Sequence, residues 1–263
     1  MKKIFIATAM LFAVLLFGNT PANAQKNRTI GIIKSALKGI EYEAKAGFVL
    51  GGTAPLPLPA EIRSIDTYNP TLSFSVEGNV VKWFGKKKKL GLNIGIRLEN
   101  KNMTTKATVK NYGMEIFGND GNKVKGNWTG GVKTKVRNSC FTIPVLAAWK
   151  INNRWNLKLG PYVSFLISKE FSGEVYEGYI RQGDPTGDKV YFRDGAVASY
   201  DFSNKLRSTQ CGIQFGADWR AFKHLKVFAD LTWGLSDIFK SNFETINFPM
   251  YPIYANIGFG YAF

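Results

Sequence analysis

Residues 155–167 read Trp-Asn-Leu-Lys-Leu-Gly-Pro-Tyr-Val-Ser-Phe-Leu-Ile, and they alternate apolar with polar side chains at a period of two. The odd-numbered positions are all apolar, whereas the even-numbered ones carry Asn, Lys, Gly, Tyr and Ser, with Leu166 as the exception. A period of two places the two sets of side chains on opposite faces of a β-strand. The stretch also exceeds the ~9–11 residues that a tilted strand needs to cross a bilayer. It therefore predicts an amphipathic strand long enough to span a membrane.

The same alternation recurs along the chain, which is predicted to be all-β with eight antiparallel strands. The other segments lie near residues 44–50, 72–80, 90–98, 141–149, 211–219, 225–235 and 253–263. Soluble barrels and sandwiches turn the apolar faces of such strands inward, whereas a transmembrane barrel turns them outward. The polar faces favour the transmembrane barrel, because they carry charges of both signs that can pair in a crowded lumen. These charges are Glu77, Arg97, Glu99, Lys158, Asp218, Arg220, Lys226 and Asp230.

The connections between the strands alternate in length. Those near residues 85–89, 151–154 and 221–223 are short, whereas those near 51–70, 101–138, 169–205 and 236–252 are long. Short periplasmic turns and long extracellular loops are typical of outer-membrane barrels, as are aromatic girdles at the two interfaces. The aromatic residues near strand ends are Trp83, Phe84, Trp149, Trp155, Trp219 and Phe263. The sequence therefore predicts an eight-stranded, up-and-down transmembrane β-barrel.

The composition argues against most metal sites. The chain has 263 residues with 35 Lys and Arg against 19 Asp and Glu, two Cys and a single His. Two Cys cannot form a zinc site of four thiolates, so neither a metal nor a cofactor is expected. Cys140 and Cys211 are assigned to non-adjacent strands and opposite faces, which disfavours a disulfide between them.

The N-terminus has the three regions of a secretory signal peptide. Met1-Lys2-Lys3 is positively charged, residues 4–18 are uncharged and apolar, and Ala22-Asn23-Ala24 fits a cleavage site. Residues 1–24 are therefore predicted to be removed on export, which places the protein in the outer membrane of a Gram-negative cell. An exported protein is not expected to bind nucleic acid.

Two regions are predicted to follow the signal peptide. Residues 25–43 are expected to form a periplasmic segment with a short amphipathic helix, because Ile30, Ile33, Leu37 and Ile40 have helical spacing. Residues 44–263 are expected to form the barrel, as a monomer.

Three motifs carry a resemblance to a known family. They are Phe141-Thr142-Ile143-Pro144-Val145-Leu146, Leu159-Gly160-Pro161-Tyr162-Val163-Ser164 and the terminal Gly258-Phe259-Gly260-Tyr261-Ala262-Phe263. Over residues 44–263 the chain resembles the porin-family, PorT-like outer-membrane β-barrel proteins, and it is similar in build to outer-membrane proteins A and X. In such proteins the final aromatic strand is read by the barrel-insertion machinery. The resemblance therefore implies an assembly role for Tyr261 and Phe263, although Phe263 also suits a girdle position.

An eight-stranded barrel is just wide enough for side chains to fill its interior, so no wide pore is expected. If the turn at 85–89 is symmetric about Lys87, Glu77 lies across from Arg97. Folding about Phe222 likewise places Asp218 across from Lys226, although both registers can shift by two residues. We expect the lumen charges, including Lys158, Arg220 and Asp230, to pair and hold the barrel closed. A gated ion path is the alternative.

Two long connections are candidate binding surfaces. The segment 101–138 carries eight basic and two acidic residues, with Lys123, Lys125, Lys133, Lys135 and Arg137 as its densest part. These residues are candidate contacts for the phosphates of lipopolysaccharide, with a solvated loop as the alternative. The segment 169–205 alternates aromatic residues around a turn at 183–188, which predicts a hairpin above the membrane. Its edge is a candidate for adding a strand from a partner protein.

Catalysis is not expected. Small barrels include lipid A deacylases and acyltransferases, which pair a nucleophilic Ser with a His near the outer rim. Here His224 falls at a periplasmic turn, on the other side of the membrane. The sequence therefore favours a structural or binding protein that acts through its extracellular loops. The alternatives are a PorT-like accessory of a protein-secretion system, docking through the four lysines 86–89, and, less favoured, a narrow-channel porin or a lipid-modifying enzyme.

Overall fold

A computed structural model describes residues 39–263, apart from residue 86 and residues 118–122. The described chain contains ten strands and one short 3-10 helix, η1. The strands are β1 (Ile40–Pro55), β2 (Ile62–Asn69), β3 (Ser73–Phe84), β4 (Leu90–Phe117), β5 (Lys123–Lys150), β6 (Trp155–Gln182), β7 (Lys189–Asp201), β8 (Thr209–Arg220), β9 (Leu225–Gly234) and β10 (Met250–Ala262), and η1 is Ser203–Lys205. None of the described residues forms a helix long and apolar enough to cross a membrane.

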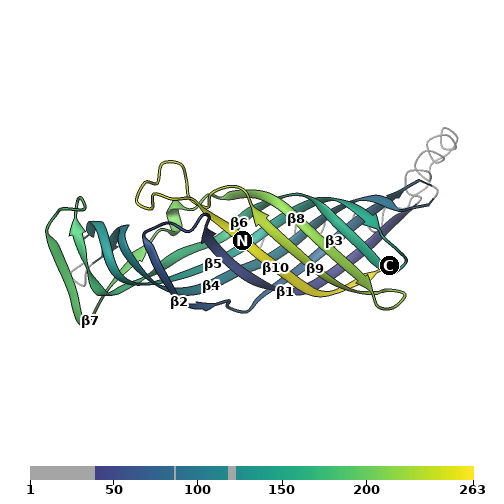
Figure 1. Cartoon of the computed structure of the whole chain (residues 1–263). Coiled ribbons are helices and arrows are strands. Elements are labelled where there is room, and N and C mark those ends of the chain that lie inside the picture. Colours follow the sequence, from purple (N-terminus) through teal and green to yellow (C-terminus); the bar gives the residue numbers. More distant parts are fainter. Residues whose placement is uncertain (1–38, 86, 118–122) are drawn as a thin grey trace, which may run out of the picture. The chain divides into compact units, whose positions relative to one another are not determined.

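Eight of these strands close into an antiparallel ring (Figure 1). The order of hydrogen-bonded neighbours is β4-β3-β1-β10-β9-β8-β6-β5, and β5 pairs with β4 to complete the ring. We call this ring the barrel. The predicted eight-stranded, up-and-down architecture is thereby confirmed.

The barrel turns its apolar side chains outward, as the alternation predicted. Val76 and Leu90 are 63% and 62% exposed, whereas the intervening positions of β3 and β4 are buried. Trp149, Trp155 and other aromatic residues lie exposed at the strand ends. The prediction was wrong for Trp83, which is buried because it shares the inward face of β3 with Ser73, Ser75, Glu77 and Asn79.

The segment 101–138 was predicted as a loop, and this was wrong. β4 and β5 each run for 28 residues and stay paired almost to their tips. The segment 169–205 forms the predicted hairpin, in which β6 continues past the barrel and pairs with β7. β2 joins the free side of β4, and a single bridge between Phe117 and Ser199 links β4 to β7. We call β2, β7 and residues 102–117, 123–138 and 168–182 the distal sheet; it lies at the end opposite the short turns (Figure 1).

The distal sheet has a hydrophobic core of its own. Its members include Trp128, Val136, Phe171, Val175 and Ile180, all of which are at most 2% exposed. Residues 202–206 and 238–250 close over this core with Phe202, Leu206, Phe239 and Met250. Burial of such side chains stabilises a fold by ~1.5–3 kcal/mol each, so this region is a packed structure and not a set of loops.

The first strand starts earlier than predicted. β1 begins at Ile40, so residues 40–43 belong to the barrel and Ile40 is not part of a helix. The two-residue alternation of Glu41, Glu43 and Lys45 places these side chains on one face, which decides for a strand. The signal peptide, residues 25–38 of the 25–43 segment and Lys86 lie outside the described residues.

Candidate functional sites

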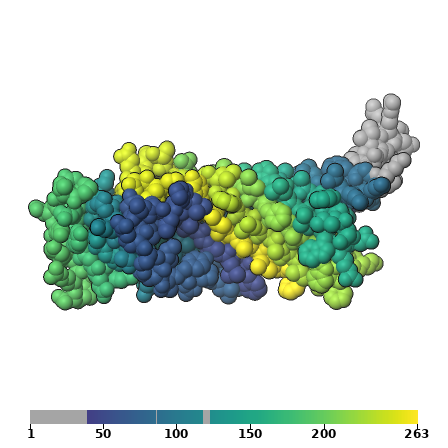
Figure 2. Space-filling model, in the orientation of Figure 1, coloured from purple at the N-terminus to yellow at the C-terminus, as the bar shows by residue number. Residues whose placement is uncertain are grey.

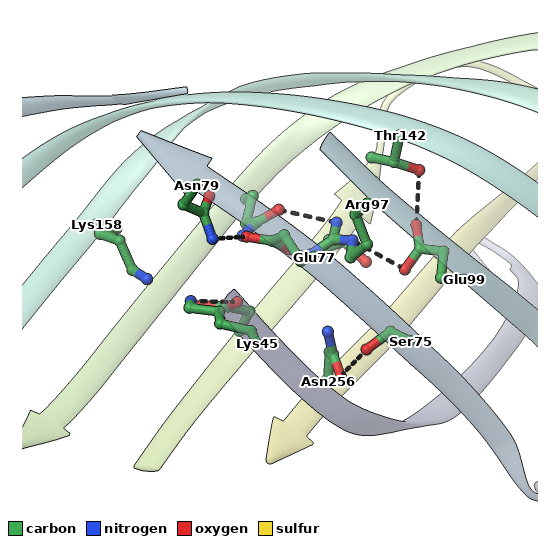
Figure 3. A network of polar contacts seen from close by, with 12 residues as sticks. Lys45, Ser75, Glu77, Asn79, Arg97, Glu99, Thr142, Lys158 and Asn256 are labelled. Carbon is green, nitrogen blue, oxygen red and sulfur yellow. Dashed lines mark hydrogen bonds and ion pairs between the residues drawn. The ribbon is translucent and has the colours of Figure 1, made fainter. Parts of the chain in front are cut away.

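The centre of the lumen is organised by one arginine. The Arg97 guanidinium lies 3.1 Å from a Glu77 carboxylate oxygen and 3.2 Å from a Glu99 carboxylate oxygen. It also donates a 3.0 Å hydrogen bond to the side-chain oxygen of Gln214 on β8. Glu99 in turn accepts a hydrogen bond from Thr142 at 2.7 Å (Figure 3). One cation therefore ties together β3, β4, β5 and β8.

A second cluster lies around Lys45 of β1. Its ammonium nitrogen is 3.3 Å from both Asp218 of β8 and Asp230 of β9. Asp218 also contacts Lys158 of β6 at 2.7 Å. Since these four residues come from four strands, their ion pairs connect opposite walls of the ring.

A third cluster closes the end of the lumen that carries the short turns. Glu41 lies 2.7 Å from Lys226 and 3.1 Å from Arg220, and it accepts a hydrogen bond from the indole nitrogen of Trp83 at 3.2 Å. Lys226 also lies 3.4 Å from Glu43. The Trp83 side chain therefore lies inside the barrel, hydrogen-bonded to Glu41 at the end of the lumen, and not in an aromatic girdle.

The buried charges of the described lumen balance. Five buried cations face five buried anions: Lys45, Arg97, Lys101, Lys158 and Lys226 against Glu43, Glu77, Glu99, Asp218 and Asp230. Removing one partner of such a buried pair costs ~3–5 kcal/mol, because the other charge is left without compensation. The buried ion pairs therefore carry no net charge together and link strands across the lumen.

The distal mouth of the lumen ends at Lys101. Its ammonium group lies 3.0 Å from Glu99 and 5.5 Å from the centre of each of the Tyr162 and Tyr254 rings. The next inward residue of β4, Met103, belongs to the hydrophobic core of the distal sheet. The polar lumen thus gives way to an apolar interior within two residues.

The structure places all eight lumen charges that the sequence singled out on the inward face, but not in every predicted pair. Glu77 lies across from Arg97, in the predicted register. Asp218 does not lie across from Lys226: it faces Phe228, while Arg220 faces Lys226. The turn is centred one residue later than assumed, which shifts the register by two and leaves every charge on the inward face.

Sequence reasoning missed part of the network. It did not single out Glu41, Glu43, Lys45 or Lys101, all of which form ion pairs in the lumen. Starting the first strand at Ala44 left out two of them, and treating 101–138 as a loop left out Lys101. The alternation of Glu41, Glu43 and Lys45 is the signal that could have found the first three.

The five basic residues of the β5 segment do not form one cluster. Phe141 belongs to the outward row of apolar residues on β5. Arg137 lies four residues beyond it, a distance of about 13 Å along the strand. Lys123 lies 18 residues beyond Phe141, on the order of 60 Å along the strand. Lys135 and Lys133 share the outward face with Arg137, whereas Lys125 lies beside Lys123 at the tip.

Three of these basic residues have acidic neighbours. Lys133 contacts Glu174 at 3.3 Å, Arg137 approaches Glu170 at 3.9 Å, and Lys123 contacts Glu115 at 2.8 Å. The side chains of these pairs are 22–63% exposed, and pairs at the surface contribute only ~0–1 kcal/mol. The ion pairs therefore hold the three basic side chains only weakly.

The remaining reactive groups are dispersed. His224 lies at the turn between β8 and β9, where its Nδ1 is 2.7 Å from the carbonyl oxygen of Ala262 and its ring stacks on Tyr261. Cys140 and Cys211 are both free, the first buried and the second exposed. Across residues 39–85, 87–117 and 123–263, no three His, Cys, Asp or Glu side chains are grouped to hold a metal ion. Tyr261 and Phe263 are exposed at the end of the chain and pack edge to face.

Residues 23–240 match the family described as outer membrane protein beta-barrel domain. Among solved structures, the chain is similar to Ail, the attachment invasion locus protein of Yersinia pestis, with 10% identity, a TM-score of 0.36, and 85% of this chain and 98% of that chain covered. It is also similar to Neisserial surface protein A (10%, TM-score 0.35, 86% and 96% covered). A third is the outer membrane protease OmpT of Escherichia coli (12%, TM-score 0.35, 86% and 97% covered). No curated protein matches the sequence.

Proposed function

The chain belongs to the family of outer-membrane proteins with a β-barrel domain, and from that premise we propose that it is a binding protein of the cell surface. In this proposal the barrel is a plugged membrane anchor, and the distal sheet is the part that contacts a partner. Export with cleavage after Ala24, a monomeric state and recognition of Tyr261 and Phe263 by the insertion machinery belong to the same proposal.

The packed core of the distal sheet is the single observation that carries this proposal. A solvated loop needs no interior, whereas here Trp128, Val136 and Val175 are completely buried beyond the end of the barrel. Since long loops of outer-membrane barrels face the cell exterior, this sheet is a rigid surface outside the cell. Rigid surfaces lose little conformational entropy on binding, which favours a role in recognition.

The edge of β7 is the favoured contact for a protein partner. One side of β7 pairs with β6, and on the other side one bridge, at Ser199, is formed by the described residues. Among the described residues, none pairs with 189–198 on that side, beside exposed Val190 and Tyr191. An extended segment of a partner can add to such an edge through main-chain hydrogen bonds.

A photocrosslinking experiment tests which end of the protein binds. The aromatic crosslinker p-benzoylphenylalanine replaces Tyr191 on β7 in one variant and Phe222 in the short turn between β8 and β9 in another. Both side chains are exposed, by 50% and 72% respectively. In intact cells we expect protein adducts from position 191 and none from position 222. Adducts from position 222 alone would favour the alternative, a PorT-like secretion accessory that docks through its periplasmic turns.

The second candidate contact is an anionic glycolipid. Lys133, Lys135 and Arg137 lie on the outward face of β5, four to eight residues beyond Phe141 of the lipid-facing row and nearer to it than Lys123 and Lys125. Changing these three to Gln is expected to weaken the binding of purified lipopolysaccharide. Changing Lys123 and Lys125 to Gln is the matched control, because these residues lie too far from the membrane. Equal affinities in both variants would reject the glycolipid contact.

We further propose that the protein is neither a wide pore nor an enzyme. The balanced ion pairs across the lumen support the first part, and planar-bilayer recordings of the purified protein are expected to show no large, steady conductance. The position of His224 beside the carbonyl of Ala262, at the end with the short turns, supports the second. Lipid A extracted from cells that express the protein should then keep its mass, and a shift would indicate a lipid-modifying activity.

A further inference from the structure

A cavity of about 280 Å³ lies where the barrel meets the distal sheet. Its walls come from the end of β1, from β2, and from the adjoining parts of β4, β5, β6 and β10. None of its lining residues is charged, and the interior is formed by side chains such as Met103, Val109, Val132 and Phe171. The lumen immediately below is, by contrast, filled with ion pairs.

The cavity lies behind a gap in the hydrogen bonding of the barrel wall. β1 pairs with β3 only as far as Val49, and residues 50–55 pair with β10 alone. β2 takes the place of β3 beside β4 at this level. No pairing joins β1 to β2 within the described residues, so no hydrogen-bonded ladder closes the wall between them. In Figure 2 the atoms of β1 and β2, coloured purple to blue, lie beside the yellow atoms of the C-terminal residues.

The mouth of the cavity is apolar and close to the membrane. Leu58, Ile65 and Tyr68 line it and are 57%, 57% and 48% exposed. Gly52, which also lines the cavity, lies two residues beyond the lipid-facing Leu50, and this is about 7 Å along β1. Exposed apolar side chains at an opening mark a site where apolar ligands bind.

Two of the hydroxyl groups that line the cavity have partners in the protein. The Thr134 hydroxyl lies 2.6 Å from the Tyr200 hydroxyl, and the Thr105 hydroxyl lies 4.0 Å from the Met103 sulfur. An apolar cavity of this kind does not hold water but does bind hydrocarbon. Its volume of about 280 Å³ is just below the ~300–1,000 Å³ typical of ligand sites, so the ligand is slender.

We propose that this cavity binds one unbranched hydrocarbon chain, the acyl chain of a membrane lipid or of a free fatty acid, which enters through the gap between β1 and β2. The uncharged lining excludes the head group, which stays outside at the mouth. This site goes beyond the proposed function, because it requires neither a partner at β7 nor a glycolipid at β5.

Photolabelling of the full-length protein tests the site. The protein is reconstituted in phosphatidylcholine vesicles that contain, in one arm, phosphatidylcholine with a diazirine at the end of an acyl chain. In the other arm the vesicles contain palmitic acid with the same diazirine. After irradiation we expect label on Val132 or Phe171, inward residues that no chain outside the barrel can reach. Label from the first arm identifies a membrane lipid as a source, and label from the second identifies the free acid.

Two tryptophan substitutions provide the matched pair. Ala107→Trp fills the cavity from its β4 wall, whereas Ala229→Trp adds the same side chain to the outward face of β9. We expect Ala107→Trp to lower the interior label about tenfold and Ala229→Trp to leave it unchanged. Heat-modifiable gel mobility verifies that both are folded. If Ala107→Trp fails to fold, Leu58→Lys at the exposed mouth should lower the label instead. Label confined to outward residues in both arms, or interior label that survives these changes, would overturn the proposal.

Discussion

The barrel and the distal sheet share three long strands, β4, β5 and β6, whose outward face is mostly apolar in the barrel and mostly polar in the distal sheet. In the lower part of β4, Ile94 points outward and is 47% exposed, while Arg97 is buried. In the upper part of the same strand, Thr108 points outward and Met114 is buried. In our proposal lipid surrounds the first part and water the second, which accounts for an apolar face that is outside in one and inside in the other. A two-residue period therefore identifies a strand but not which face is covered.

The reversal needs no change in the strand itself. Arg97, Lys101, Met103 and Val109 all lie on the same inward face of β4, although the first two are charged and the last two are apolar. The register shift in β4 comes only later, between Val109 and Tyr112. The same alternate positions of β4 point inward in both regions, so a change from charged to apolar residues at these positions is enough to replace a polar lumen by a hydrophobic core.

The largest expected effect is in the lumen. Arg97→Met leaves Glu77 and Glu99 without their common cation, and we expect the free energy of unfolding to fall by ~3–5 kcal/mol. Urea titration of the heat-modifiable band measures this. Arg137→Met on the distal sheet is the control, with an expected loss of at most ~1 kcal/mol, because its pair with Glu170 is exposed. Equal losses would mean that the lumen pairs do not stabilise the barrel.

In the distal sheet the largest effect should come from its apolar core. Trp128 is completely buried, packs edge to face on Phe192, and donates a hydrogen bond to the carbonyl of Gly131. Trp128→Ala is expected to destabilise this region by ~3–5 kcal/mol. Protease added to intact cells should then cleave the distal sheet while the barrel keeps its heat-modifiable mobility. Trp149→Ala, on the lipid-facing side of β5, should not increase cleavage.

A single outward charge should distinguish the two environments on one strand. Ile94→Arg places a cation in lipid and is expected to cost ~2–4 kcal/mol if it lies near the midplane. Thr108→Arg places the same side chain on the same face of β4 in water, where surface substitutions usually change stability by ~0.5 kcal/mol or less. Folding into vesicles at increasing urea measures both. A large cost at position 108 would place lipid around the distal sheet.

The smallest effect is a pH dependence of the distal sheet. Burial raises the pKa of the Tyr200 phenol well above its ordinary value, because the ionised form would lose its hydration. Its stabilisation is therefore complete below the pKa of the unfolded chain, ~10, and is lost as the pH rises above that value. Protease cleavage of the distal sheet should increase above pH ~10. The increase should be smaller in Tyr200→Phe, and an unchanged pH profile in that variant would assign the effect to other groups.

The sequence predicted the barrel well because lipid imposes a simple rule on it. The outward apolar rows, the short turns and the inward position of Glu77, Arg97, Lys158 and Asp218 all follow from a period of two. The cross-strand partner of each charge was harder to predict. A register shift of two residues places Lys226 across from Arg220 and not across from Asp218, while both stay on the inward face. Trp83 was assigned to a girdle from its position near a strand end, although its parity placed it inside.

The distal sheet was harder to predict because its residues follow the same period with the opposite meaning. In 101–138 the many basic residues led to the prediction of a charged loop. The inward Met103, Val109, Val132 and Val136 form a core only when β6 and residues 238–250 pack against them. No local pattern shows this contact, because it joins β4 to residues 238–250, more than a hundred residues later in the chain.

The amino-acid sequence by itself determined that strands of alternating character close into an antiparallel barrel with charges inside and apolar side chains facing lipid, since periodicity and turn length are local properties. Only the tertiary structure decided which charges pair, where the polar interior becomes apolar, and that a cavity opens where β2 replaces β3 beside β4. These depend on register and on contacts between distant strands, and neither is encoded in any one segment.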